Sequence, residues 1–324
     1  DIEHALQVAN VIPLRLQTHF DLHGHERRSM DGAQQSNPRA GASSANSIRN
    51  MYRDSMEIKM MHQSPPVLVI ENFLTPQECQ EIEAVAMAAE NGHDGGSGAV
   101  QVESATFAMS QSTRTSTSWF AHFYQVPQLV AKIHYLLGIP LEHMEEPQIV
   151  RYKTGQEFSW HYDEVPAAQL ANGGQRVATI LVYLNTVEEG GGTVFRDLRA
   201  PTKSEFAAPA AGCDDFEEEC TFDNVITGPR ASSTGSSTNN DQDQDFLTVQ
   251  PKQGRACIFF PALADGKPDD RTLHKGEVVA ENQEKRIVQM WIHENPYAPV
   301  LPPGNSQMAA RELVGEMGHE LGFV

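Results

Sequence analysis

Apolar residues along the chain follow two different periods, one on each side of about residue 148. Before that position, two stretches have the three-to-four-residue spacing of amphipathic helices. The first follows Thr75, where Thr75, Pro76 and Glu78 form the capping-box pattern that begins a helix. The second is PQLVAKIHYLLG, with a proline at its start and a glycine at its end. A short apolar run over 67–70 predicts a strand ahead of both helices.

After residue 148 the apolar residues come in short β-branched or aromatic runs, separated by glycine, proline and acidic turns. The runs are QIVRY, RVATILVYL, GTVF, FLTVQ, RACIFF and RIVQMWIH. This pattern is typical of an all-β sandwich or barrel. Because helices precede the strands, we expect an α+β, mainly β fold: a jelly roll, or double-stranded β-helix, buttressed by N-terminal helices.

Composition divides the 324 residues into one patterned domain with less patterned flanks. Residues 1–62 are polar and weakly patterned, and we expect an N-terminal extension that is partly flexible. Residues 63–297 hold the periodic segments and form the predicted domain. Within it, about 197–246 is an insertion with acidic and low-complexity parts. Residues 298–324 form a tail, in which SQMAARELVGEM predicts a short amphipathic helix docked on the domain.

Composition and charge exclude some partners. The formal net charge of −19 argues against binding to nucleic acid or to an anionic membrane face. No apolar run reaches the roughly 18 residues of a membrane helix, so we expect no membrane segment. The four cysteines lack the C-x-x-C spacing of a zinc ribbon or thioredoxin motif. Cys213 and Cys220 could close a small disulfide loop or stay reduced.

A candidate metal site begins in SWHYDEVP, residues 159–166. Residues i and i+2 of a strand point to the same face, so His161 and Asp163 would project together. His274, in DDRTLHKGEVV, could complete a two-histidine, one-carboxylate triad, which leaves open positions on Fe(II). With 13 histidines in the chain, these three residues alone do not decide the question. A surface histidine bonded to an aspartate is the ordinary alternative.

Several further segments resemble, in order, the prolyl 4-hydroxylase family of Fe(II)- and 2-oxoglutarate-dependent dioxygenases. The resemblance covers about residues 66–297 and leaves out the insertion, the N-terminal extension and the tail. The segments are VLVIENFLTPQECQEI, SQSTRTSTSWF, VRYKTGQEFSWHYDEV, GGQRVATILVYLNTVEEGGGTVF, LTVQPKQGRACIFFPA, LHKGEVV and EKRIVQMWIHENPY.

The resemblance implies an activity and its cofactors. A member of this family is a procollagen-proline 4-dioxygenase-like enzyme that uses Fe(II), O2 and 2-oxoglutarate. It would hydroxylate prolyl residues of a peptide or protein and release succinate and CO2. Ascorbate would be expected to rescue oxidised iron. The implied partner is a proline-containing peptide or protein, and the endoplasmic reticulum lumen or secretory pathway is favoured, with the cytoplasm left open.

The family pattern also assigns roles to individual residues. His161, Asp163 and His274 would ligate iron. A lysine on a late strand, matched by Lys285, would grip the far carboxylate of 2-oxoglutarate, with hydroxyl groups from Tyr152 and Thr193. A cation is needed there because the co-substrate is a dianion, and burying an unpaired carboxylate is costly.

Two spacings call for local irregularities. The distance from His274 to Lys285 is one residue longer than in the family, which a bulge or longer turn near AENQ would absorb. Arg286 is therefore an alternative, although the register of Trp291 favours Lys285. Tyr152 lies nine residues before His161. An odd offset would put the two side chains on opposite faces of a regular strand, so we expect a turn or bulge near Gly155.

Substrate contacts are less defined. By resemblance, Arg176 matches an arginine linked to peptide binding and Trp291 matches the family's tryptophan, and both are candidate catalytic residues. Phe158 stands where many members have a tyrosine, which leaves substrate positioning open. Trp119 and Phe120 are expected to pack in the core.

Three other functions stay open on sequence grounds. The chain could be an oxygenase for another substrate, such as a free amino acid or a different side chain. It could be a non-catalytic jelly-roll module that binds proline-rich peptides. It could also be a cupin-like hydrolase or isomerase with another divalent metal, which would have no need of Lys285, Tyr152 and Thr193 together.

Overall fold

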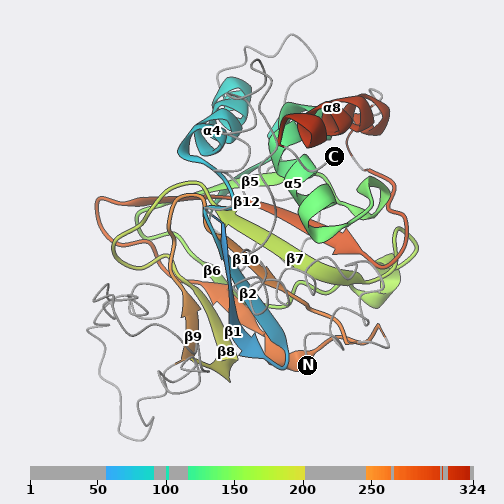
Figure 1. Ribbon diagram of the computed structural model, residues 1–324. Helices are drawn as coiled ribbons and strands as arrows, with labels where there is room; N and C mark the ends of the chain where they lie inside the picture. The colour runs from blue at the N-terminus through green and yellow to red at the C-terminus, as the bar shows by residue number, and fades with distance from the viewer. Residues whose placement is uncertain are drawn as a thin grey trace, which may run out of the picture.

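The computed structural model describes residues 56–90, 100–101, 116–200, 246–263, 266–299, 301 and 306–321. Most of these residues belong to two antiparallel sheets and to helices that cover the larger sheet (Figure 1). The expectations for residues 1–55 and for most of the insertion, including Cys213 and Cys220, lie outside the described residues. The predicted mainly β fold with a few helices is confirmed.

The larger sheet has eight strands, and each neighbouring pair is antiparallel. From one edge to the other the strands are β1 (Glu57–Gln63), β2 (Pro66–Glu71), β10 (Ala256–Phe259), β7 (Arg176–Tyr183), β12 (Glu284–His293), β5 (Gln148–Lys153), β4 (Thr117–Phe120) and β3 (Val100–Gln101). The predicted runs supply its central strands.

The smaller sheet has four strands, also antiparallel. In order they are β6 (Phe158–His161), β11 (His274–Gly276), β8 (Thr193–Arg199) and β9 (Phe246–Val249). The two sheets enclose one apolar core, which includes Val69, Leu181 and Phe259. Short 3₁₀ turns connect the elements, at Phe123–Gln125, Leu141–His143, Ala167–Gln169 and Asp270–Thr272.

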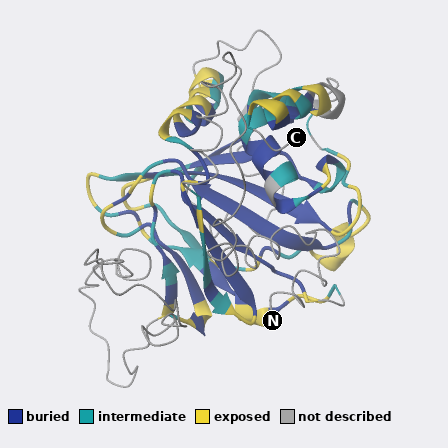
Figure 2. Cartoon of the chain, in the orientation of Figure 1, coloured by how far each residue is buried: buried dark blue, intermediate teal, exposed yellow. Residues whose placement is uncertain are grey.

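Strands β2, β7 and β10 of the larger sheet are buried on both faces, as their dark colour in Figure 2 shows. On β7, Ile180 and Val182 join the core on the helix side, whereas Leu181 and Tyr183 join the core between the sheets. Burial on both faces explains why the sequence of this strand is a continuous apolar run without alternation.

Helices α4 (Pro76–Glu90), α5 (Pro127–Leu137) and α8 (Ser306–Glu320) cover the outer face of the larger sheet (Figure 1). The predicted capping box is present at the start of α4. The Glu78 N–H donates to Thr75 Oγ1 at 3.1 Å, and the Thr75 N–H donates to Glu78 Oε2 at 2.7 Å. That carboxylate also accepts from Lys132 Nζ of α5 at 2.7 Å, which joins the two helices by a buried ion pair.

The predicted tail helix is α8, and it docks on the domain. Ala310 and Val314 are buried in the same core cluster as α5. Within the described part of the chain, none of the helices has the length and apolar character that crossing a membrane requires.

Strand β1 lies inside the stretch expected to belong to the N-terminal extension, so regular structure begins before residue 62. It is an edge strand of the larger sheet and pairs with β2, with a register shift between Met60 and His62. This irregularity interrupts the two-residue alternation by which a strand is recognised, which is why the pattern was weak.

Candidate active site

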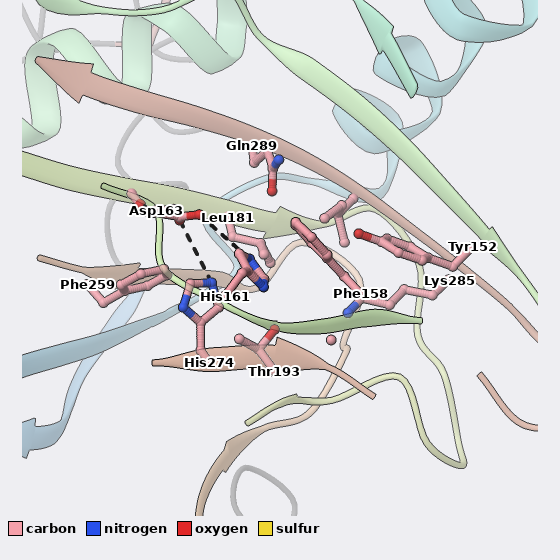
Figure 3. A pocket seen from close by; sticks show the side chains of 13 residues that line it. Tyr152, Phe158, His161, Asp163, Leu181, Thr193, Phe259, His274, Lys285 and Gln289 are labelled. Atoms are coloured by element: carbon pink, nitrogen blue, oxygen red, sulfur yellow. Dashed lines mark hydrogen bonds and ion pairs between the residues drawn. The ribbon is translucent and has the colours of Figure 1, made fainter. Parts of the chain in front are cut away.

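Three potential metal ligands meet where β6 and β11 pair. His161 and His274 are directly opposite each other in this antiparallel ladder, and Asp163 follows the end of β6. One ligand atom from each residue lies within 4.8 Å of the others (Figure 3). Asp163 Oδ1 is 3.7 Å from His161 Nε2, and its Oδ2 is 3.8 Å from His274 Nε2. The strands thus bring together residues that are far apart in sequence.

Backbone carbonyls fix the orientation of both imidazoles. His161 Nδ1 is 2.7 Å from the carbonyl oxygen of Ser159, and His274 Nδ1 is 2.9 Å from that of Thr272. A carbonyl can only accept, so each Nδ1 carries a proton. In the neutral ring Nε2 then keeps its lone pair and is available to a metal ion. Such a bond is the usual support of a metal-binding histidine.

The carboxylate of Asp163 is buried and held ionised. Burial alone would raise the pKa of Asp163, but His274, His161 and Arg176, with the Thr179 hydrogen bond, outweigh it and keep this pKa below its ordinary value. Thr179 Oγ1 donates to Asp163 Oδ2 at 2.8 Å. Two imidazole nitrogens and an anionic oxygen on one side of a cavity fit the donor set of non-haem Fe(II).

A cavity that is partly open to solvent extends from these ligands between the two sheets (Figure 3). Besides the three ligands, its lining comprises Tyr152, Phe158, Thr179, Leu181, Thr193, Phe259, Gly276, Lys285, Ile287 and Gln289. All three residues predicted to hold 2-oxoglutarate are therefore in one cavity with the candidate ligands.

Lys285, rather than Arg286, faces this cavity. The Lys285 side chain is 2% exposed, and its Nζ lies 5.4 Å from the ring centroid of Tyr152, its cross-strand partner. Arg286 instead donates to Glu83 and Glu284, each at 2.7 Å. The expected longer turn is present near AENQ, where asparagine 282 has a φ of 60°. The expected turn before β6 is also present, with a φ of 77° at glycine 155.

Thr193 is joined to a residue that the sequence analysis did not single out. The Tyr183 hydroxyl is 2.7 Å from Thr193 Oγ1 and 3.0 Å from the carbonyl oxygen of Val249. Burial raises the pKa of Tyr183 well above its ordinary value, so the hydroxyl stays protonated. The two-residue period of a strand puts Thr179, Leu181 and Tyr183 on one face of β7, but the continuous apolar run does not show in the sequence that this face is the one toward the cavity.

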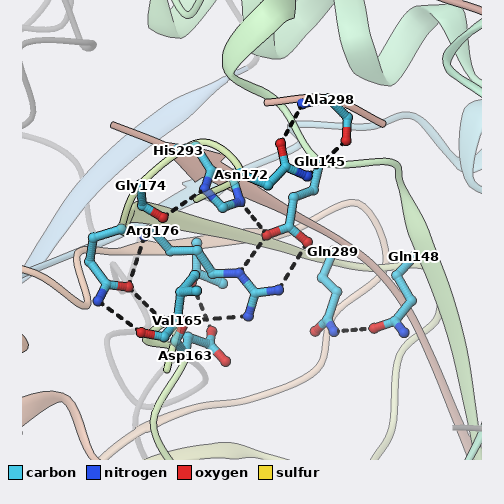
Figure 4. Close-up of polar contacts among 12 residues, drawn as sticks. Glu145, Gln148, Asp163, Val165, Asn172, Gly174, Arg176, Gln289, His293 and Ala298 are labelled. Atoms are coloured by element: carbon cyan, nitrogen blue, oxygen red, sulfur yellow. Dashed lines mark hydrogen bonds and ion pairs between the residues drawn. The ribbon is translucent and has the colours of Figure 1, made fainter. Parts of the chain in front are cut away.

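Arg176 and Trp291 lie against each other, and neither lines the cavity. In Figure 4 the guanidinium group of Arg176 lies between Glu145 and the Asp163 backbone. The guanidinium carbon of Arg176 is 3.9 Å from the centroid of the Trp291 ring. Its Nε and Nη2 donate to the two carboxylate oxygens of Glu145, at 2.6 and 2.9 Å. Glu145 Oε1 is also 2.5 Å from His293 Nε2. The expected link of Arg176 to peptide binding and the catalytic assignment of Arg176 and Trp291 stay predictions.

Two aromatic residues occupy different environments. The Phe158 ring stacks on His161 with ring centroids 3.5 Å apart and 18° between planes. It therefore presents an apolar surface, without a hydroxyl, next to the candidate ligands. Trp119 is 1% exposed in the helix-side core, as expected.

Two antiparallel sheets around a His-x-Asp…His cluster define a jelly-roll protein with a site for a divalent metal ion. The model of the 2OG-Fe(II) oxygenase superfamily matches residues 147–293, where 2OG denotes 2-oxoglutarate. Prolyl 4-hydroxylase 2 of Arabidopsis thaliana is 30% identical over 255 residues, which cover 76% of this chain and 73% of that protein. Probable prolyl 4-hydroxylase 4 of the same plant is 27% identical over 264 residues, covering 80% and 78%.

Among solved structures, the viral collagen prolyl hydroxylase of Paramecium Bursaria Chlorella virus-1 in its 2OG complex aligns with a TM-score of 0.40 and 21% identity. The alignment covers 70% of this chain and 94% of that one. The chain belongs to the 2OG-Fe(II) oxygenase superfamily, as the family model and the Arabidopsis thaliana relatives establish. It is a 2OG-Fe(II)-dependent oxygenase, and this family and the triad imply Fe(II) and 2-oxoglutarate.

Proposed function

We propose that the protein is a prolyl 4-hydroxylase that acts on prolyl residues of a peptide or protein and releases succinate and CO2. One observation carries the proposal: a His-Asp-His cluster and the buried Lys285 line the same cavity, in a chain whose relatives are named prolyl 4-hydroxylases. We further propose that residues 63–297, with β1, form the catalytic domain.

His161 and His274 would hold Fe(II) through Nε2, and Asp163 would hold it through a carboxylate oxygen. Bound Fe(II), with 2-oxoglutarate, supplies the activation of O2 for hydroxylation of an unactivated carbon. The chain's own contribution is to present three fixed ligands. The Ser159 and Thr272 carbonyls hold the two rings by their Nδ1 protons, so that neither ring turns away.

Lys285, Tyr152 and Thr193 would bind the far carboxylate of 2-oxoglutarate. Lys285 supplies a positive charge in a buried place, where an ion pair to an anion is little screened. Gly276 lies beside it: a Cβ at that position would be 3.5 Å from Lys285 Nζ, an ordinary van der Waals contact.

The proposed substrate is a proline-containing peptide in an extended, polyproline II-like form. Phe158 would contact it through the apolar face of its ring. Arg176 is proposed to contribute to peptide placement together with Trp291, from its fixed position against Glu145. Ascorbate is proposed as the reductant that restores activity after uncoupled turnover.

Phe158 also favours a second candidate, an oxygenase for a different substrate. A ring without a hydroxyl gives the cavity one hydrogen-bonding group fewer than the family pattern. A free amino acid or another side chain would then be hydroxylated in place of a prolyl residue.

The test is turnover with defined substrates. The protein is supplied with Fe(II), 2-oxoglutarate and ascorbate, and succinate release and product mass are measured with proline-containing peptides. Matched peptides with alanine in place of proline serve as controls. Peptide-dependent succinate and a gain of one oxygen atom, lost in His161→Ala, would support the proposal. Turnover stimulated by free amino acids but by no peptide would favour the second candidate.

A further inference from the structure

The loop that follows Asp163 is closed at its base by the side chain of Gln175, which bonds to the backbone of Val165. Gln175 Oε1 accepts from the Val165 N–H at 2.5 Å, and Gln175 Nε2 donates to the Val165 carbonyl at 3.2 Å. Oε1 also accepts from the Arg176 N–H at 2.9 Å. The amide group thus pairs with the Val165 backbone as a neighbouring strand would, and Gln175 is only 6% exposed.

This pairing lies two residues after Asp163 and fixes the chain on that side. On the other side, the ladder between β6 and β11 holds His161 opposite His274. Between them, Arg176 Nη1 donates to the carbonyl oxygen of Asp163 at 3.3 Å. The backbone of Asp163 is therefore held before, at and after the residue, which sets where its side chain begins, and the Thr179 hydroxyl holds the carboxylate itself.

Asn172, three residues before Gln175 in the same loop, makes a pairing of the same kind. Asn172 Nδ2 donates to the carbonyl oxygen of Ala298 at 2.9 Å, and the Ala298 N–H donates to Asn172 Oδ1 at 2.8 Å. It attaches the loop to the segment after β12, at a distance along the chain from Asp163. The loop therefore provides its own comparison between a pairing next to Asp163 and a pairing farther from it along the chain.

We propose that Gln175 is a positioning residue for the metal-binding carboxylate, and that it acts on Asp163 through the backbone of Val165. The proposal rests on the proposed function only in taking His161, Asp163 and His274 as the metal ligands. Loss of the Gln175–Val165 pairing would let the Asp163 backbone rotate. The Asp163 carboxylate would then spend less time pointing toward the metal site. Residues that orient a ligand typically change metal affinity about 10–100-fold when they are mutated.

The experiment is a calorimetric titration with Mn(II), which is stable in air, of the wild type and of three variants. Gln175→Met and Asn172→Leu each replace an amide by an apolar group of similar size. We expect Gln175→Met to weaken Mn(II) binding about 10-fold and Asn172→Leu to change it less than about 2-fold. Thermal melts without metal record how far each variant is destabilised. Equal Mn(II) affinities in the two variants would overturn the proposal, because the pairing would then be merely structural.

His274→Ala separates this proposal from the assignment of the ligands. If His274→Ala binds Mn(II) as tightly as the wild type does, the ligand assignment itself is wrong. If only His274→Ala weakens binding, the ligands stand and the role of Gln175 is refuted.

A measurement on the wild type keeps the proposal testable if Gln175→Met does not fold. Hydrogen exchange of the Val165 amide is followed with and without Mn(II). A bonded, buried amide exchanges only when the structure around it opens. If the Gln175–Val165 pairing exists before metal binds, the Val165 amide should exchange slowly in the metal-free protein, and its exchange rate should change less than about 2-fold on Mn(II) binding. Fast exchange that becomes slow only with Mn(II) would show that the metal orders the loop, and would overturn the proposal.

Discussion

Replacing Lys285 by methionine removes a charge and leaves most of the side-chain volume. The side chain is 2% exposed and lines the cavity beside Tyr152. If Lys285 pairs with the far carboxylate of 2-oxoglutarate, the variant must bury that carboxylate without its cation. Truncating one partner of a buried charge pair costs about 2–5 kcal/mol. At about 1.4 kcal/mol for each factor of ten, the affinity for 2-oxoglutarate should fall roughly 30-fold to several thousand-fold.

The assay is the KM for 2-oxoglutarate in succinate release, checked by direct titration of 2-oxoglutarate into the Mn(II)-loaded protein. Arg286→Met is the matched control, since Arg286 is the next residue and pairs with Glu83 and Glu284 away from the cavity. Its KM should stay within about 2-fold of the wild type, as expected for a surface ion pair. The reasoning is refuted if Lys285→Met keeps its affinity within about 3-fold, or if Arg286→Met loses affinity instead.

Two further predictions concern stability and are read from thermal or denaturant melts. Burial would raise the pKa of Glu145, but Arg176 and His293 lower it below its ordinary value of 4.5. Its stabilisation is therefore complete above that pH and is lost as the pH falls through the folded-state pKa. Glu145→Gln should cost about 3 kcal/mol at pH 7 by leaving a buried charge unpaired, with a smaller difference from the wild type in acid; a difference independent of pH would contradict this. The second prediction compares two glycines with positive φ. Gly155→Ala meets nothing within 4 Å and should cost about 1 kcal/mol, whereas a Cβ on Gly254 would collide with the Leu74 carbonyl and should cost several times more; similar costs would show that the backbone at Gly254 yields.

The sequence predicted the helices, the central strands and the three residues at the heart of the site. Those elements have local signals: a capping box at Thr75, a helix-ending glycine after α5, and long apolar runs. No local pattern in the sequence places the two short strands β6 and β11 side by side. The expectation that His161 and His274 meet therefore came from their shared role as metal ligands, and the structure has them opposite each other.

Other features could not be predicted, for physical reasons. Tyr183 and Thr179 stand in a strand buried on both faces, where the sequence gives no contrast between the side toward the helices and the side toward the cavity. The pairing of Arg176 with Glu145 joins residues from different elements without any periodic spacing. Gln175 was also overlooked, because a side-chain amide that bonds to a backbone follows neither the helical nor the strand period.

The pairing of β6 with β11 also bears on how the chain folds. His161 and His274 are brought together only after everything between them, including the long connection from β8 to β9, has been synthesised. Contacts of this kind are non-local and form slowly. The entropy of closing a loop, however, grows only with the logarithm of its length, by about 0.6 kcal/mol for each doubling. A long insertion between β8 and β9 therefore slows the pairing of β6 with β11 more than it lowers the stability of that pairing. This connection is thus a place where the chain can vary in length while the metal ligands stay in register.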